Sequence, residues 1–491
     1  MSLRTVAWYI GVSLLFVSAL MLVGAVIACC TPGDVSRIPL FCSALFAGAV
    51  GACPLLFIRK GGHILRFQEG NAIVVGSWLF ACLFGMLPFL MYGGEFTFVN
   101  ALFESVSGFT TTGASILNDI EALPRGLQFW RISTAWVGGI GIVTLFSMIM
   151  RGNMEKSALS GAEISDVARL SFRGMRSAAF ANRILVTYVM LTVVTGLSLK
   201  LTGMGWFDSA TNAMSACSTC GFCTRNASIA FYDNPAAEMV LTVAMLAAGA
   251  NFGVLFLSFV RGSGRNLFKS EIFRTFLFLV AGSVCLVTVD LLVHGGYEAF
   301  GDAVRDASFQ VASIATTTGF ATQDTTTWPM LSMAVLLVCS LVCGCSGSTS
   351  GGIKIDRVVL AFKGVHNRVG TAIEPGTVRA IRVDGRPRDM RQADEALGFI
   401  FCYLVIVGVL AGVNMAFGMD FTTGLTASVA CIGNVGPGFG DVGSMANYAA
   451  IPDILKFTST AGMLIGRLEI FPFLYFIRAL RLRSAAQALR T

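Results

Sequence analysis

Long apolar segments alternate with short polar loops along the 491 residues of the chain. About ten segments are apolar enough to be spans, and each approaches the roughly 20 residues that an α-helix needs to cross a bilayer. They predict membrane spans at 6–30, 39–58, 72–92, 127–150, 183–202, 237–260, 273–294, 329–343 with 353–362, 394–417 and 453–478. The first segment is longer than the apolar core of a signal peptide, so we interpret it as a retained helix.

Four short segments rich in Thr, Ser and Gly recur about every 100 residues between the apolar stretches. We call them the signature segments: Thr110, Thr111, Thr112 and Gly113; Ser218, Thr219, Cys220 and Gly221; Thr316, Thr317, Thr318 and Gly319; Gly433, Asn434, Val435 and Gly436. Each follows a stretch that can form a half-length helix. Extended strands of this kind can surround an axis with backbone carbonyls, which replace the hydration shell of K⁺ in a selectivity filter. The repetition therefore predicts a potassium pore.

The residues around the signature segments correspond as well. Nine residues before the closing glycines stand Glu104, Asn212, Gln310 and Ala427, and six residues before them stand Ser107, Ser215, Ser313 and Ala430. Positions three residues apart share one face of a helix. Five residues after the glycines stand amides or carboxylates, at Asn118, Asn226, Asp324 and Asp441. We predict that these last four residues form a ring at the pore entrance.

The whole pattern predicts an all-α polytopic membrane protein with four pseudo-symmetric repeats around one pore. Each repeat reads as an outward span, a half-helix, a signature segment and an inward span, over 70–150, 183–262, 273–362 and 394–480. Residues 1–60 read as an additional N-terminal pair of transmembrane helices. Non-helical backbone is tolerated at membrane depth where protein buries it or where it lines a water-filled cavity. Four strands around a pore meet that condition.

Composition and charge agree with a membrane protein. Hydrophobic residues make up 55% of the chain and charged residues 13%, and the mean hydropathy is +0.73, whereas soluble domains carry about 25% charged residues. Most of the 35 Lys and Arg fall in loops on one side of the predicted spans. The positive-inside rule places that side, with both termini, in the cytoplasm and the signature segments at the outer face. Basic residues confined to short loops argue against nucleic-acid binding.

Small residues interrupt the inward span of the third repeat. We call this stretch the small-residue loop, and it consists of Gly344, Cys345, Ser346, Gly347, Ser348, Thr349, Ser350, Gly351 and Gly352. Gly lowers helix propensity by about 1 kcal/mol per residue, and Ser favours local side-chain hydrogen bonds. A flexible break below a filter can obstruct a pore and move aside, so we predict a gate. The alternative is a closely packed helix crossing, which small residues also mediate in membranes.

Arg467 lies within the last apolar segment, where a charged side chain is expensive and is functional by default. We expect its guanidinium to face the pore and to bond carbonyl oxygens of the small-residue loop. The alternative is a structural ion pair with a neighbouring helix, although Glu469 is unsuitable because i,i+2 residues do not face each other. We count Lys354 among the gate residues and expect its side chain to extend toward the cytoplasmic side.

Three cysteines around the second signature segment, Cys217, Cys220 and Cys223, have the spacing of an iron–sulfur run. No fourth cysteine follows at a suitable distance, and none of the 3 histidines is near them in the sequence. A membrane metal or redox protein is therefore the less favoured alternative. We expect Cys223 to face the outer vestibule, which predicts that thiol reagents act from outside.

The chain resembles the Trk/Ktr/HKT superfamily of potassium transporters, and its TrkH branch in particular. The resemblance covers nearly the whole chain and rests on the signature segments and the runs 345–354, 434–438 and 466–471. It implies a non-enzymatic, multi-pass potassium uptake protein of the bacterial inner membrane, surrounded by lipids and assembled as a homodimer. It also implies K⁺ ions in the signature segments, no organic cofactor in this chain, and a cytosolic TrkA-like partner that binds nucleotides such as NAD or ATP.

Two alternatives of the same class stay open. In the superfamily, Ser in place of a filter glycine accompanies Na⁺ permeation, and all four glycines are present here. Proton symport would need membrane-embedded carboxylates, for which Glu104, Asp290 and Glu469 are the candidates. The sequence therefore allows K⁺ uptake by passive conduction or by proton coupling.

Overall fold

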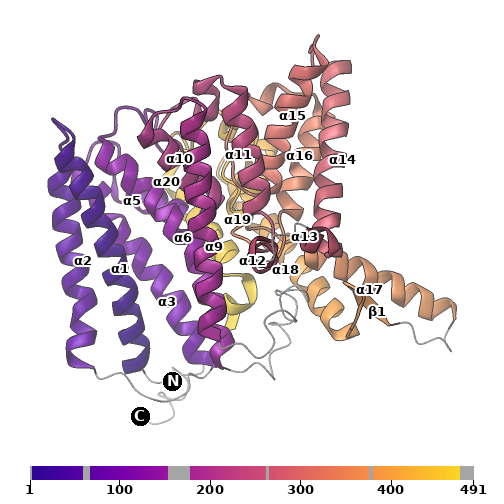
Figure 1. Cartoon of the computed structure of the whole chain (residues 1–491), viewed down its shortest axis with the longest axis horizontal. Coiled ribbons are helices and arrows are strands. Elements are labelled where there is room, and N and C mark those ends of the chain that lie inside the picture. Colours follow the sequence, from indigo (N-terminus) through magenta and orange to yellow (C-terminus); the bar gives the residue numbers. More distant parts are fainter. Residues whose placement is uncertain (1–2, 59–66, 153–176, 261–264, 375–379, 476–491) are drawn as a thin grey trace.

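The apolar segments form long helices that stand side by side (Figure 1). The computed structural model describes residues 3–58, 67–152, 177–260, 265–374 and 380–475. Among these residues, six helices are long and apolar enough to cross a membrane alone, and one bent pair makes up to seven. The all-α polytopic membrane fold is therefore confirmed. The predicted cytoplasmic ends of the chain, and most of the loop 151–182, lie outside the described residues.

One order of helices recurs four times after the N-terminal pair, α1 (Leu3–Cys30) and α2 (Arg37–Phe57). The first spans are α3 (Phe67–Gly85) with α4 (Leu87–Tyr92), α9 (Ser177–Leu201), α14 (Glu271–His294) and α18 (Met390–Ala416). The half-helices are α5 (Phe98–Phe109), α10 (Trp206–Ser218), α15 (Phe300–Ala315) and α19 (Phe421–Gly433). The second spans are α6 (Arg125–Gly152), α11 (Pro235–Ala248) with α12 (Phe252–Val260), α16 (Met330–Val342) with α17 (Ile355–Ile373), and α20 (Asp453–Arg467).

Short elements connect these helices. They are α13 (Arg265–Lys269), the 3₁₀ turns η1 (Ser228–Tyr232), η2 (Thr325–Thr327) and η3 (Gly440–Val442), and the antiparallel strands β1 (Ile381–Val383) and β2 (Arg386–Arg388). The hairpin lies beside α17, and together they extend sideways from the helical body (Figure 1). The described chain is thus helical apart from this hairpin and its loops.

Glycines bring α1 and α2 into close contact, since a Cβ atom on Gly11 would lie 2.5 Å from Gly51 O. Small residues are the usual means of such approach between membrane helices. The turn between the two helices contains Asp34. Its Oδ1 accepts the N–H of Ser36 at 2.8 Å, and its Oδ2 accepts the N–H of Gly126 at 2.9 Å. This buried carboxylate fastens the N-terminal pair to α6.

The predicted span 237–260 consists of two helices, α11 and α12, that pass the length and hydropathy test for a membrane span only as a bent pair. The axis turns by 110° between α11 and α12. Asn251 stabilises the start of α12, because its Oδ1 accepts the N–H of Val254 at 3.1 Å. Its Nδ2 donates to Ser346 O at 2.6 Å, within the small-residue loop. The bend is therefore set by a contact with a distant part of the chain.

The last predicted span, 453–478, is also interrupted within its described part. The helix α20 ends at Arg467, and Glu469 follows with a φ of +61° before helix resumes at Ile470. Gly466 explains the close packing at this end, since a Cβ there would lie 2.0 Å from Ile432 O. The second spans of the last three repeats are thus all broken, whereas α6 is continuous.

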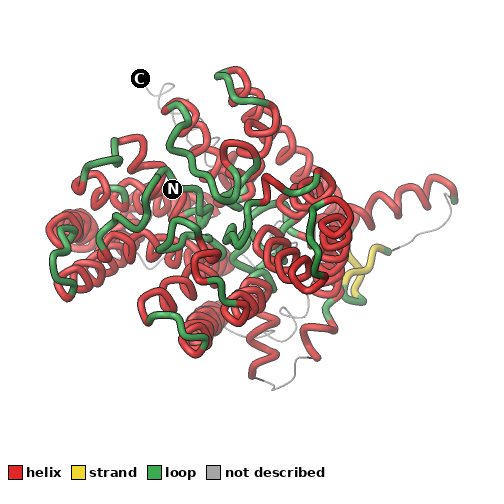
Figure 2. Tube along the Cα trace, turned by 90° about the horizontal axis from the view of Figure 1, so that it is seen from above, coloured by secondary structure: helices red, strands yellow, loops and turns green. Residues whose placement is uncertain are grey.

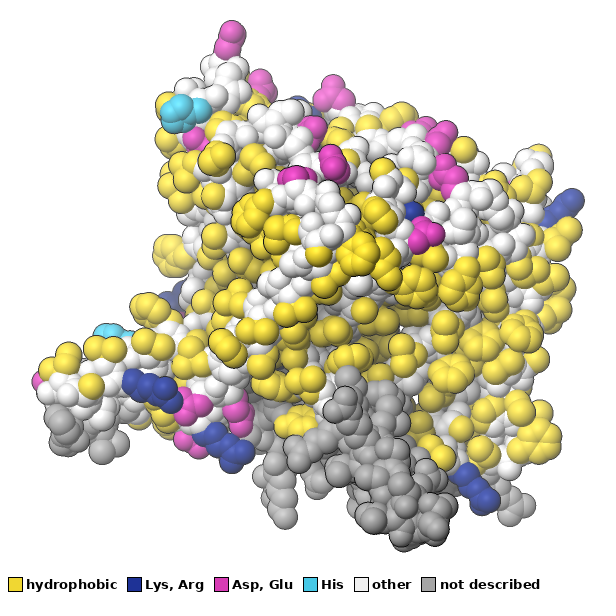
Figure 3. Space-filling model, turned by 180° about the vertical axis from the view of Figure 1, so that it is seen from behind, with side chains coloured by type: hydrophobic (Ala, Val, Ile, Leu, Met, Phe, Trp, Pro, Cys, Tyr) yellow, Lys and Arg dark blue, Asp and Glu magenta, His cyan; other side chains and the backbone are white. Residues whose placement is uncertain are grey.

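The surface has three zones along the helix direction (Figure 3). A wide band of hydrophobic side chains covers the middle of the face shown, Asp and Glu gather toward its upper end, and Lys and Arg are mainly toward the lower end. Large apolar side chains are exposed on the first spans of the repeats, for example Phe278 of α14 at 77% and Phe401 of α18 at 69%. An apolar belt of this kind suits contact with lipid tails, with basic residues at one membrane surface.

Candidate functional site

The four signature segments share one backbone conformation. Their second residues have φ between +53° and +57°, and their closing glycines have φ between +80° and +95°. Their third residues donate the N–H to the carbonyl five positions earlier: Thr112 to Ser107 (2.8 Å), Cys220 to Ser215 (3.1 Å), Thr318 to Ser313 (2.8 Å) and Val435 to Ala430 (2.9 Å). The repetition seen in the sequence is therefore a repetition of structure.

The segments close into a ring in chain order. A Cβ atom on each glycine would meet a carbonyl oxygen of the next segment: Gly113 with Cys220 (1.8 Å), Gly221 with Thr318 (2.2 Å), Gly319 with Val435 (2.3 Å) and Gly436 with Thr112 (2.5 Å). Seen from above, loops meet near the middle of the surrounding helices (Figure 2). Only glycine combines a positive φ with contacts this close.

The half-helices aim their carboxyl ends at this ring, because each of them ends where a signature segment begins or within its first residue. The C-terminal end of a helix carries a partial negative charge of about half an elementary charge. Four such ends around one ring lower the local potential, which favours a cation.

The helix-face residues predicted from the alignment support the chain that follows the glycines in the first three repeats. Glu104 Oε2 accepts the N–H of Ile116 at 3.0 Å, and Gln310 Nε2 donates to Gln323 O at 3.1 Å. Asn212 Oδ1 accepts from Cys223 Sγ at 3.4 Å. In the fourth repeat Ala427 has no polar group, and Thr426 takes over the task by accepting the N–H of Phe439 at 2.9 Å. The comparison of the four repeats did not single out Thr426, because it lies ten residues before Gly436, one position before Ala427.

The residues predicted as a pore-entrance ring lie in the loops after the glycines. Three of them hold those loops together: Asn118 Nδ2 donates to Glu95 Oε1 (3.1 Å), Asn226 Nδ2 donates to Asp119 Oδ1 (2.9 Å), and Asp324 Oδ1 accepts the N–H of Thr326 (3.0 Å). Asp441 is exposed. The hydrogen bond from Asn226 lowers the pKa of Asp119. A role for the four as ion ligands stays a prediction.

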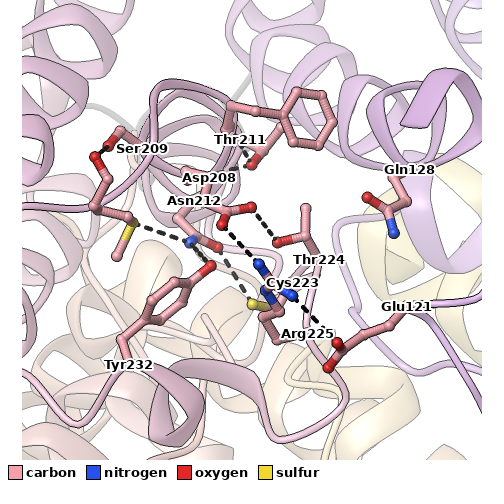
Figure 4. A network of polar contacts seen from close by, with 12 residues as sticks. Glu121, Gln128, Asp208, Ser209, Thr211, Asn212, Cys223, Thr224, Arg225 and Tyr232 are labelled. Carbon is pink, nitrogen blue, oxygen red and sulfur yellow. Dashed lines mark hydrogen bonds and ion pairs between the residues drawn. The ribbon is translucent and has the colours of Figure 1, made fainter. Parts of the chain in front are cut away.

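A polar network joins the loops behind the first two signature segments (Figure 4). Arg225 donates to Glu121 Oε2 at 3.2 Å and to Asp208 Oδ2 at 3.3 Å, and Thr224 Oγ1 donates to Asp208 Oδ1 at 2.8 Å. Asn212 Nδ2 donates to the Tyr232 hydroxyl at 3.3 Å. The sequence pattern did not reveal this network, in which Glu121 of the first repeat contacts Arg225 of the second.

The small-residue loop separates α16 from α17 and is not helical. All its Ser and Thr residues are buried. Its contacts reach the signature segments and their half-helices: Ser350 Oγ donates to Thr316 O (2.9 Å), Gly351 N donates to Thr317 Oγ1 (3.0 Å), and Thr349 Oγ1 donates to Cys217 O (3.1 Å). Because no helix forms there, the alternative of a closely packed helix crossing is wrong.

Arg467 reaches the small-residue loop as predicted. It is 3% exposed, and its Nη1 donates to Thr349 O at 2.7 Å while its Nη2 donates to Gly138 O at 3.3 Å. Both hydrogen-bond acceptors found for it within the described residues are backbone carbonyls, so the expected alternative of an ion pair has no support. One guanidinium thus holds the loop against α6.

The Lys354 side chain does not reach solvent, so the prediction that it extends to the cytoplasmic surface is wrong. Its side chain is buried, and its Nζ donates to Glu469 Oε1 at 3.1 Å. Arg357 Nη2 donates to the other oxygen of the same carboxylate at 2.8 Å. The break after α20 therefore places Glu469 where it pairs with both basic residues at the start of α17.

The cysteines of the second repeat are buried, so the expectation that Cys223 faces the outer vestibule is wrong. Cys217 and Cys220 are 0% exposed and Cys223 is 4% exposed. Packing of the chain after Gly221 against α10 places the Cys223 thiol within reach of Asn212 Oδ1. Among the residues described, no group of three or more His, Cys, Asp or Glu is placed to hold a metal ion. The iron–sulfur alternative thus has no structural support.

This burial predicts that the three thiols are protected in the folded protein. A membrane-impermeant maleimide should leave Cys217, Cys220 and Cys223 unmodified, because reaction requires an accessible thiolate. Peptide mass spectrometry after labelling measures this directly. Asp441→Cys, at an exposed loop position, is the positive control, and unfolded protein should react at every thiol. Modification of native Cys223 at the rate of the control would contradict the packing described.

Comparison with known proteins agrees with this architecture. The family model described as TrkH, cation transport protein, matches residues 40–486. The potassium uptake proteins TrkH of Salmonella typhimurium and of Vibrio parahaemolyticus are both 32% identical to the chain, over 96% and 97% of it and 98% and 99% of their own lengths. The crystal structure of the potassium transporter TrkH from Vibrio parahaemolyticus superposes with a TM-score of 0.87 at 30% identity, covering 97% of this chain and 98% of that one. The chain therefore belongs to the TrkH family of cation transport proteins.

Proposed function

We propose that the protein takes up K⁺ across the bacterial inner membrane through a filter formed by the four signature segments. The ring of glycine-to-carbonyl contacts carries the proposal, because it surrounds one axis with four strands of the same conformation. Backbone carbonyls in such a ring can replace the hydration shell of K⁺. The relatives named as potassium uptake proteins support the choice of ion.

The small-residue loop and Arg467 form the gate in this proposal. The loop donates hydrogen bonds to Thr316 O and Thr317 Oγ1 in the third signature segment. Arg467 adds a fixed positive charge and holds Thr349 O. A charge of the same sign as the ion raises the barrier to conduction. Movement of the loop away from these contacts would open the path.

The assembly follows the same proposal. Residues 1–60 form the additional helix pair and the four repeats form the pore, with both chain termini in the cytoplasm. A cytosolic, nucleotide-binding TrkA-like subunit would control the gate, and two copies of the chain would form a homodimer. The relatives are named as parts of a Trk system, which supports a partner subunit. The chain itself would bind K⁺ and leave nucleotide binding to that partner.

Ion flux into proteoliposomes tests the proposed function. The purified protein should carry K⁺ and Rb⁺ faster than Na⁺ and Li⁺, because the carbonyl ring is suited to the larger dehydrated ions. Each ion is measured at the same concentration and membrane potential, with protein-free liposomes as the blank. Equal fluxes of K⁺ and Na⁺ through well-inserted protein would remove the filter assignment. A pH-sensitive dye inside the vesicles separates passive flux from proton symport.

A further inference from the structure

A buried ion pair lies behind the first two signature segments. Arg131 of α6 is 2% exposed and Glu104 of α5 is 0% exposed, and Arg131 Nε donates to Glu104 Oε1 at 2.5 Å. Burying two charges is favourable only where the geometry is good and the remaining polar atoms have hydrogen-bond partners. The identity of those partners shows what the pair holds.

The further partners of the pair lie just after the first two filter glycines. Ser115 Oγ donates to Glu104 Oε1 at 3.1 Å, and Ile116 N donates to Oε2 at 3.0 Å, in the loop that follows Gly113. Arg131 Nη1 donates to Cys223 O at 3.1 Å, in the strand that follows Gly221. The guanidinium also lies 3.6 Å from the centre of the Phe222 ring. One ion pair thus connects the strands of two neighbouring repeats.

Only the first of the four repeats has a charged residue at the position of Glu104. The residues equivalent to Glu104 are Asn212, Gln310 and Ala427, none of which carries a charge. The hydrogen bonds of Asn212 and Gln310 stay within their own repeats, at Cys223, Tyr232 and Gln323 among others. Only the Glu104–Arg131 pair, among these positions in the described chain, reaches from one repeat into the next. It joins the same two repeats as the closest of the four glycine contacts, in which a Cβ atom built on Gly113 would lie 1.8 Å from Cys220 O.

We propose that Glu104 and Arg131 are positioning residues that fix the distance between the first two signature segments and thereby sharpen the discrimination between K⁺ and Na⁺. The inference rests on the proposed function. The pair is neutral overall, so it holds the strands without adding a net charge behind the filter. Discrimination depends on the number and placement of the carbonyls around the ion. Without the pair, the second strand is free to shift its carbonyls relative to the first.

The test compares ion discrimination with the amount of inserted protein. Glu104→Gln keeps the size of the side chain but leaves Arg131 without its counter-charge. Glu104→Gln combined with Arg131→Met removes both charges, which avoids a buried unpaired ion. The double variant should insert well and should show a K⁺/Na⁺ flux ratio lowered by about tenfold, as for other groups that orient ion ligands from behind. Arg131→Lys should fall between it and wild type, because Lys keeps the charge but loses the planar fork.

A second ion pair supplies the matched control. Arg305 of α15 donates from Nε to Glu238 Oε2 at 2.6 Å, and Glu238 is 4% exposed. This pair also joins two repeats, but among the described residues neither side chain has a hydrogen bond to the residues that directly follow a signature segment, as Glu104 has to Ser115 and Ile116 and Arg131 has to Cys223. Glu238→Gln with Arg305→Met should therefore keep the wild-type K⁺/Na⁺ ratio. A structural role alone would make the two double variants behave alike.

A measurement without flux guards against variants that insert poorly. Ions that bind only the folded protein raise its unfolding temperature, so K⁺ should stabilise wild-type protein in detergent more than Na⁺ does. The Glu104→Gln, Arg131→Met variant should lose most of that difference, and the Glu238, Arg305 variant should keep it. If the Glu104→Gln, Arg131→Met variant keeps both the wild-type K⁺/Na⁺ flux ratio and the wild-type difference in unfolding temperature between K⁺ and Na⁺, the positioning role is overturned. Wild-type protein that does not discriminate between the ions would instead overturn the proposed function.

Discussion

Gly113→Ser should lower the K⁺/Na⁺ flux ratio by about tenfold or more. The glycine has a φ of +80°, and a Cβ there would lie 1.8 Å from Cys220 O. An L-residue in the left-handed region costs roughly 1–2 kcal/mol, and 1.4 kcal/mol corresponds to a factor of ten in an equilibrium. The overlap adds to this strain and can be relieved only if the Cys220 carbonyl moves. The altered carbonyl ring should then admit Na⁺, as measured by paired K⁺ and Na⁺ fluxes in proteoliposomes.

Gly203→Ser is the matched control for this prediction. Gly203 has a φ of +98° in the loop before α10, but nothing lies within 4 Å of a Cβ built there. Its substitution brings the same backbone strain without touching the ring. It should lower stability slightly and leave the ratio at the wild-type value. An unchanged ratio in Gly113→Ser, or an equal loss in both variants, would mean that the glycine contact does not set ion preference.

The sequence was sufficient for the features that depend on residue type and local spacing. The recurrence of Thr-, Ser- and Gly-rich segments with corresponding neighbours predicts four copies of one local structure, and the stretches before them predict half-length helices; the left-handed backbone at their second residues was not predicted. The reach of Arg467 to the small-residue loop was also predictable, because a buried guanidinium needs acceptors and the loop offers free carbonyls. These features repeat or are local, and one sequence contains enough information for them.

Contacts between distant parts of the chain could not be predicted. The stretch 237–260 reads as one apolar span, and its bend depends on Asn251 bonding Ser346, 95 residues away. Lys354 was expected near the surface, but Glu469, 115 residues away, holds it inside. The burial of Cys223 likewise depends on the packing of α10 and its neighbours. In each case hydrophobicity and propensity describe the segment correctly, and a tertiary partner decides its course.

Arg467→Met should raise the basal K⁺ flux per inserted molecule by about tenfold or more. The substitution removes the hydrogen bonds to Thr349 O and Gly138 O and the positive charge, while it keeps most of the side-chain volume. A hydrogen bond from a charged donor contributes about 1.5–3 kcal/mol, which corresponds to at least a factor of ten in the closed-to-open equilibrium. The loop should therefore leave its blocking position more often.

The K⁺/Na⁺ flux ratio of Arg467→Met shows whether Arg467 acts on the gate or on the filter. Arg467 has no hydrogen bond to a signature-segment carbonyl within the described residues, so the K⁺/Na⁺ ratio of Arg467→Met should equal that of wild type. Arg467→Lys should give an intermediate flux, because it keeps the charge but cannot bond two carbonyls with a rigid fork. Among the residues that the structure describes, no carboxylate pairs with Arg467, so insertion should stay near normal in either variant. Normal insertion with flux no higher than wild type would show that another contact holds the loop closed.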